Sequence, residues 1–135
     1  MKRQPISFGD FIKQKRLEHE KLQSDIAKAL DISVSFVSEI ERRCKLPFTA
    51  DKMEKFAEFL NLTGEEKAEM YDLASRAKNE VPADIAETFM YEDVGDMARF
   101  ALREFQAGNL EEEDWKDLIR KAEKNKLRRK GGGNK

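Results

Sequence analysis

Residue types that build many functional sites are scarce in this 135-residue sequence, which holds one cysteine, one histidine and one tryptophan. The single cysteine, Cys44, excludes a disulfide within the chain and fits a reducing compartment. A zinc site around the single histidine, His19, would need several carboxylates, and no such spacing occurs. No apolar run approaches the roughly 20 residues of a membrane span, and no signal peptide opens the chain. We therefore expect a cytoplasmic protein that holds no metal or other cofactor and contacts no membrane.

Sequence signals of catalysis and of β-strands are missing as well. There is no glycine loop that could cradle a phosphate, no nucleophile motif and no metal-ligand spacing, so we do not expect an enzyme. Apolar residues recur at helical spacing along most of the chain, and strand patterns are absent. With 39% hydrophobic residues, a chain of this length can bury one core and a smaller satellite. The expected fold is therefore all-α.

The most informative segment is residues 23–43, where two short helical patterns are joined by a tight polar turn. The first pattern places three apolar side chains on one face: Ile26, Ala27 and Leu30. Ser33 can cap the second helix, which turns Val37 and Ile40 inward. Ala27 is small enough to let two helices cross steeply after so short a turn. This pattern predicts a helix-turn-helix.

The same residues resemble the lambda-repressor-like, or Xre-like, helix-turn-helix family over about residues 8–62. The resemblance is carried by Asp25-Ile26-Ala27, Leu30-Asp31-Ile32-Ser33, Ser38-Glu39-Ile40-Glu41-Arg42 and Pro47. It implies a recognition helix that starts near Ser33 and enters the major groove of DNA. Three positions depart from the family pattern. Arg43 stands where glycine is usual, Lys15 where an apolar residue is usual, and Leu22 where a small polar cap is usual.

The contacts with DNA follow from the outward side of this helix. The residues expected to reach base edges are Val34, Ser35, Ser38 and Glu39. The resemblance, together with the suitability of helix starts and clustered cations for anions, gives the expected phosphate contacts: Gln23, Ser24, Ser33, Arg42, Arg43 and Lys45. The alternative for the three cations is a solvated loop cluster. The resemblance also implies a structural ion pair between Arg16 and Glu41.

Charge is unevenly distributed along the chain, although the net charge is only −1. Residues 1–48 hold ten Lys and Arg against seven Asp and Glu, residues 49–120 hold nine against nineteen, and residues 121–135 hold seven against one. A basic head on an acidic body favours DNA contact at the head. Because patchy charge is common in small helical proteins, the prediction of DNA binding depends on the helix-turn-helix pattern and not on charge.

Domain organisation follows from the helical patterns. A five-helix head is expected over residues 1–79, and its fifth helix opens with a capping box at Thr63. Pro82 lies at the expected boundary, and about three further helices should form a C-terminal segment over residues 80–123. Residues 124–135 are basic and glycine-rich, which predicts a flexible tail.

Two regular apolar stripes, at residues 94–105 and 115–122, must bury against something. Packing within the chain is one interpretation, and self-association is the other. Residues that could form a dimer interface are Met97, Leu102, Phe105, Trp115, Leu118 and Ile119. A homodimer would place two recognition helices about 34 Å apart, one turn of DNA.

The sequence therefore predicts a transcriptional regulator that binds double-stranded DNA sequence-specifically. It would act as a repressor, as a homodimer on a two-fold operator, through the helix at residues 33–42. The alternative is an antitoxin-type protein that binds its own operator and neutralises a partner protein through its C-terminal helices.

Overall fold

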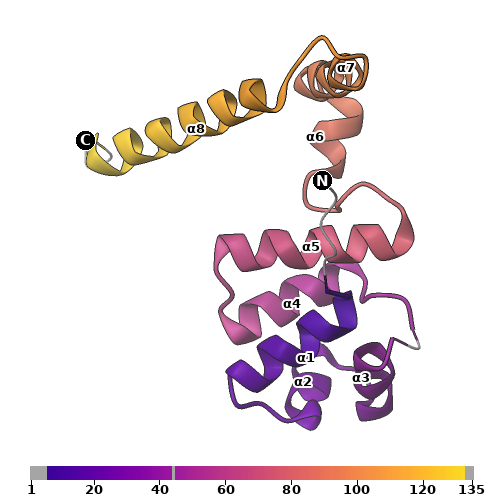
Figure 1. Cartoon of the computed structure of the whole chain (residues 1–135). Helices are drawn as coiled ribbons and strands as arrows, with labels where there is room; N and C mark the ends of the chain where they lie inside the picture. Colours follow the sequence, from indigo (N-terminus) through magenta and orange to yellow (C-terminus); the bar gives the residue numbers. More distant parts are fainter. Residues whose placement is uncertain (1–5, 44, 133–135) are drawn as a thin grey trace. The chain divides into compact units, whose positions relative to one another are not determined.

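The computed structural model describes residues 6–43 and 45–132, and every regular element in these ranges is a helix (Figure 1). In chain order the helices are α1 (Phe8–Glu18), α2 (Gln23–Leu30), α3 (Val34–Glu41), α4 (Ala50–Leu60), α5 (Gly64–Lys78), α6 (Ala86–Tyr91), α7 (Asp93–Gln106) and α8 (Glu112–Gly132). The all-α prediction is confirmed, with five helices in the head and three after it. None of the helices in this part of the chain is long and apolar enough to span a membrane.

The chain divides into two compact units, Met1–Glu87 and Thr88–Lys135. This division falls inside α6, eight residues beyond the boundary expected after residue 79. Pro82 does not open the next helix directly. Residues 83–85 form a turn in which the N–H of Ile85 donates to the carbonyl of Pro82 at 3.2 Å, and α6 begins after this turn.

The core of the first unit is built from α1–α5 and from one loop residue, Phe48. The buried ring of Phe48 lies 5.7 Å from that of Phe8, 6.4 Å from that of Phe36 and 6.3 Å from that of Phe56, centroid to centroid. These rings connect α1, α3 and α4 through the loop. In Figure 1, α2 and α3 lie together at one side of the unit and α5 lies at the other.

Local sequence determines where several helices begin and end. The hydroxyl of Thr63 accepts from the N–H of Glu66 at 3.1 Å, and the Glu66 carboxylate accepts from the N–H of Thr63 at 2.9 Å, which confirms the predicted capping box. Leu22 offers no acceptor at the start of α2. Its N–H instead donates to the Asp25 carboxylate at 2.8 Å, so α2 starts at Gln23 without a polar cap residue.

The backbones of α1 and α3 come into near contact at Gly9, which is buried. A Cβ atom at Gly9 would lie 2.3 Å from the carbonyl oxygen of Ile40 and 3.2 Å from that of Glu41. Only a residue without a side chain permits this crossing, because the obstacle is backbone and cannot rotate away. Gly9 therefore sets the distance between α3 and the body of the unit.

Lys15 connects α1 to α5. This connection explains how a cation is accommodated at a position where the family pattern usually has an apolar residue. Its ammonium group lies 2.8 Å from the Glu66 carboxylate, 3.2 Å from that of Glu18 and 5.6 Å from the centre of the Phe11 ring. The hydrogen bond from Lys15, together with the N–H of Thr63, lowers the pKa of Glu66 to about 2. The same hydrogen bond raises the pKa of Lys15.

In the second unit, α6 and α7 form a tight corner at Gly95. A Cβ atom there would lie 2.2 Å from the carbonyl oxygen of Thr88 and 2.3 Å from that of Phe89. The Arg99 guanidinium donates to the same Phe89 carbonyl and lies 5.7 Å from the centre of the Phe89 ring. Glycine is therefore required at this corner as well.

Helix α8 runs to Gly132, so residues 124–132 are helical where a flexible tail was expected. Lysine, arginine and glutamate favour the helix, and cations near its C-terminus interact favourably with the helix dipole. These local preferences explain the extension of the helix to Lys130, and the helix ends two residues later. Residues 133–135 lie outside the described part, and the flexibility of the segment stays a prediction.

Replacing Gly9 by alanine should destabilise the first unit, because the new methyl group would force α1 away from the Ile40 carbonyl. We expect a loss of about 1–3 kcal/mol in the free energy of unfolding, measured by urea denaturation. Gly64→Ala is the matched control, since a Cβ at Gly64 meets nothing within 4 Å. The control should leave stability unchanged or raise it by about 0.4–1 kcal/mol. Equal stability of the two variants would contradict the proposed near contact.

Replacing Glu66 by glutamine should lower stability in a pH-dependent way. The Glu66 pKa is depressed, so its contribution is present above the ordinary pKa of 4.5 and is lost as the pH falls toward about 2. Because its side chain is 28% exposed, we expect a difference from wild type of only about 0.5–1 kcal/mol at pH 7, shrinking toward zero as the solution is acidified. Urea unfolding between pH 7 and pH 3 measures it. Glu69→Gln, at an exposed position of α5, should show no such trend, and a difference that grew on acidification would reverse the assigned sign.

Candidate nucleic-acid interface

Helix α3 has one side buried in the first unit and one side exposed. Ser33 caps its start, because its hydroxyl accepts from the N–H of Phe36 at 3.0 Å. Val37 and Ile40 are buried, and the Phe36 ring is stacked on Phe48 at an interplanar angle of 24°. The helix is therefore anchored along its inner side, as the sequence pattern predicted.

The four residues expected to read bases lie on the outer side of this helix. Val34 is 46% exposed, Ser35 is exposed, and Ser38 and Glu39 are half-buried. The side chains of Val34, Ser35 and Ser38 are short, so a partner can approach the helix closely there. Their role as base-reading residues stays a prediction.

A buried ion pair holds the C-terminal end of α3 against α1. Arg16 donates to the two carboxylate oxygens of Glu41, from Nε at 2.7 Å and from Nη2 at 3.0 Å. The side chains of Arg16 and Glu41 are only 10% and 4% exposed. Arg16 also donates to the backbone carbonyl of Lys21 at 2.9 Å, and the Gln23 amide donates to Glu41 at 3.1 Å. The pair that the resemblance implied is thus present and is hydrogen-bonded to Lys21, which precedes α2, and to Gln23, the first residue of α2.

Sequence reasoning did not anticipate the position of Gln23. One N–H of its amide is engaged with Glu41, and the second N–H is left for another acceptor. Ser24 and Ser33 are exposed, and the hydroxyl hydrogen of Ser33 can still be donated after its oxygen caps α3. Phosphate contacts from these three residues stay predictions.

The chain leaves α3 through Arg43, which has a left-handed conformation with φ of 64°. Its N–H donates to the Ile40 carbonyl at 3.0 Å and ends the helix. This is a conformation that glycine adopts without strain, whereas a side chain costs about 1–2 kcal/mol. The departure from the family pattern therefore keeps the usual turn and adds a cation to it.

Three exposed cations gather where α3 ends. The Arg43 guanidinium lies 3.3 Å from the Asp10 carboxylate, and the Lys45 ammonium group lies 3.8 Å from that of Glu39. Arg42 turns back and donates from Nε to the carbonyl of Ser38 at 3.4 Å. The ion pairs of Arg43 and Lys45 are weak and exposed, so these two cations can exchange their carboxylate partners for phosphate oxygens at little energetic cost. Cys44, which lies between them in sequence, is outside the described residues.

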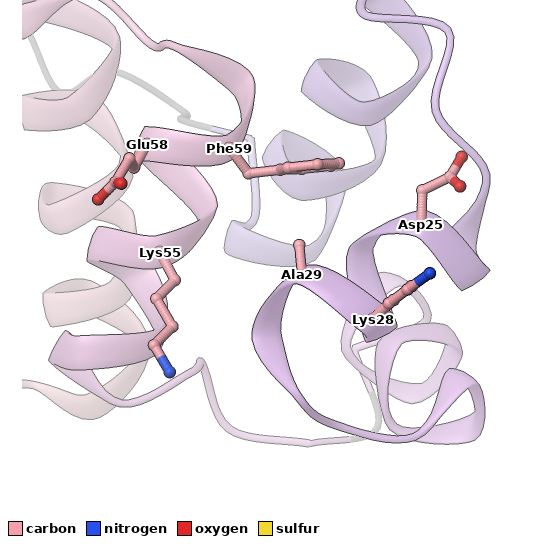
Figure 2. Close-up of a pocket in the computed structure, with 6 residues that line it drawn as sticks. All are labelled: Asp25, Lys28, Ala29, Lys55, Glu58 and Phe59. Atoms are coloured by element: carbon pink, nitrogen blue, oxygen red, sulfur yellow. The ribbon is translucent and has the colours of Figure 1, made fainter.

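A hollow of about 870 Å³ lies between α2 and α4. Its lining residues are Asp25, Lys28, Ala29, Lys55, Glu58 and Phe59. Figure 2 shows Phe59 extending from α4 across the hollow and the charged side chains around it. Two carboxylates and two ammonium groups give the hollow no preference for an anion, and none of the predicted DNA contacts lines it.

The family comparison identifies the matched part of the chain. Residues 12–67 match the family model described as helix-turn-helix. The matched residues run from α1 into α5. The match confirms the resemblance predicted over about residues 8–62. No curated protein and no solved structure matched the chain.

Replacing Glu41 by alanine should unfold the first unit more readily without changing base preference. The variant leaves the Arg16 guanidinium buried without its partner, for which we expect a loss of about 3–5 kcal/mol in the free energy of unfolding. Glu39→Ala is the matched control on the exposed side of α3, and it should change stability by less than about 0.5 kcal/mol. Thermal and urea unfolding measure the stability of both variants. An unchanged melting temperature for Glu41→Ala would contradict the structural role of the pair.

Proposed function

We propose that this protein is a repressor of the Xre/lambda-repressor-like helix-turn-helix family, a family of DNA-binding transcriptional regulators that residues 12–67 match, and that it inserts α3 into the major groove. The observation that supports the proposal best is the two-sided character of α3. Its inner side is fixed by buried apolar residues and by the Arg16–Glu41 pair, and its outer side carries the exposed Val34 and Ser35 and the half-buried Ser38 and Glu39. A rigidly held helix of this kind fits the major groove.

The outer side of α3 offers specific but limited base contacts. Glu39 can accept a hydrogen bond from the amino group of cytosine, the serines can donate or accept, and Val34 can contact a thymine methyl group. Serine does not form the bidentate contacts that are worth about 1–3 kcal/mol each. Part of the specificity should therefore come from the shape of the DNA and from reading two half-sites together.

The cations at the end of α3 supply contacts that do not depend on sequence. Three exposed cations follow the outer side of α3: Arg42, Arg43 and Lys45. They would contact the phosphates that flank the major groove. Acidic residues dominate 49–120, so DNA would be repelled from much of the rest of the chain. Together these charges favour approach of the duplex to α3.

Apolar exposure in the second unit supports action as a homodimer on a two-fold operator. In α7 and α8, Met97 is 67% exposed, Leu118 60% and Ile119 58%, and Leu102 and Phe105 are also exposed. Large contiguous apolar surfaces commonly mark interfaces. Association of two copies would bring two α3 helices to half-sites about 34 Å apart.

The same exposed surface supports the alternative, an antitoxin-type protein whose C-terminal helices neutralise a partner protein. The two functions differ in what occupies α7 and α8. A stable complex with the product of a neighbouring gene, recovered at one copy each from the native host, would favour the antitoxin. Self-association of the purified protein, with no such complex, favours the repressor.

The proposal predicts selective DNA binding that depends on α3. Fluorescence anisotropy with the duplex upstream of the gene, against a scrambled duplex, should give a discrimination of roughly 10³ or more. Ser35→Ala and Glu39→Ala should reduce this ratio. Arg43→Gly should instead weaken binding to both duplexes equally and reduce the log–log salt slope by about 1.

Arg43→Gly is designed to separate charge from folding, because glycine suits the left-handed conformation at this position. The free energy of unfolding should therefore stay the same or rise while DNA affinity falls. Equal losses on both duplexes for all three variants would remove the base-reading role of Ser35 and Glu39.

A further inference from the structure

Helix α8 carries opposite charges in its two halves. From Glu111 to Asp117 the chain holds five acidic residues and one basic residue, whereas from Arg120 to Lys130 it holds seven basic residues and one acidic residue. Within the described part, the ion pairs of α8 are those of Arg120, with Glu113 at 2.8 Å and Asp117 at 2.5 Å. The other charged residues of α8 that the structure describes are exposed, and no ion pair is found for them. The helix therefore presents an acidic end and a basic end to solvent.

An apolar stripe lies along the middle of the same helix. Trp115 is half-buried, with its ring 6.3 Å from that of Phe105 in α7, whereas Leu118, Ile119 and Ala122 are exposed. The spacing of three, four and seven residues places these side chains on one side of the helix. The stripe is therefore suited to contact a second helix.

Each edge of this stripe changes from acidic to basic along the helix. Residues seven apart lie nearly above one another on a helix. One edge carries Glu112, Ile119 and Lys126, and the other carries Asp114, Lys121 and Arg128. On the line of the stripe itself, Glu111 precedes Trp115 by four residues and Arg129 follows Ala122 by seven. The charge gradient thus occurs where a second helix would meet it.

From this arrangement we propose that α8 pairs antiparallel with α8 of a second copy of the chain. With Leu118 of one copy level with Ala122 of the other, the two-fold axis passes near Arg120. Glu111 then lies level with Arg129 of the other copy, and Glu112 lies within about 3 Å, measured along the axis, of Lys126. A parallel pair would instead place acid beside acid and base beside base. The inference rests on the homodimer of the proposed function and specifies which helix forms it and in which direction.

A second copy of the chain would complement more of the surface of α8 than a nucleic acid would. DNA phosphates would attract the basic half, but they would repel the acidic half and leave the apolar stripe uncovered. An antiparallel copy neutralises both halves and covers the stripe. It also explains why neither half is balanced within its own chain.

The test exchanges charges along the stripe in the full-length protein, and sedimentation equilibrium without DNA measures association. The acid-end variant is Glu111→Lys/Glu112→Lys, and the base-end variant is Lys126→Glu/Arg129→Glu. Each alone should raise the dimer dissociation constant by roughly ten-fold or more, because attraction becomes repulsion between residues 111 and 129 and between residues 112 and 126 of the two copies. An equimolar mixture of the two should form heterodimers, and the four substitutions in one chain should restore the homodimer.

Matched controls keep these results interpretable. Glu113→Lys/Asp117→Lys changes the net charge as the acid-end variant does, but on the side of α8 opposite the stripe, so it should leave the dissociation constant within about two-fold of wild type. Wild-type association should weaken as salt is added. Far-ultraviolet circular dichroism checks that each variant keeps its helix content.

Several outcomes would overturn the antiparallel pair. These are a monomeric wild type, unchanged association of both end variants, or no recovery in the mixture and in the four-substitution chain. Loss of DNA affinity in the base-end variant alone, with association unchanged, would assign the basic half to DNA. Sequence discrimination by α3 is measured separately on the two duplexes, so the proposed function can stand or fall independently of α8.

Discussion

The orientation of α3 depends on the buried ion pair between Arg16 and Glu41. A helix of eight residues is too short to be stable alone, so its position must come from contacts with the rest of the unit. Burying two charges is unfavourable unless their hydrogen bonds are complete. Here Glu41 accepts from Arg16 and Gln23, and Arg16 also donates to the Lys21 carbonyl. The pair thus fixes one end of α3 by geometry that an apolar contact would not impose.

Because α3 is supported in this way, its outer residues contribute little to the stability of the fold. The backbone contact at Gly9 sets the distance between α1 and α3, and the stacking of Phe36 on Phe48 supports the inner side. Ser35 contributes to none of these contacts, and Glu39 contributes only a weak exposed pair with Lys45. The side chains that we propose to contact bases can therefore vary with little effect on the fold.

The sequence predicted features that depend on near neighbours and missed those that depend on distant ones. The cap at Ser33 and the capping box at Thr63 follow from spacings of a few residues. Burial of the loop residue Phe48, the bond from Lys15 to Glu66 and the donation from Gln23 to Glu41 connect residues far apart in the chain. No helical period signals such contacts. The family resemblance located Arg16 and Glu41 because a pattern of that family, unlike a period, includes distant positions.

The second unit shows where an amphipathic pattern stops being informative. Helices α4 and α7 both carry regular apolar stripes, yet that of α4 is buried within its unit and much of that of α7 is exposed. Periodicity predicts that a surface will be covered and does not say by what. Charge supplies the missing direction in α8, because an acidic end and a basic end flanking one stripe match a second such helix only when it runs the opposite way. The excess of positive charge near the C-terminus is then half of a complementary surface, and the acidic residues that precede it are the other half.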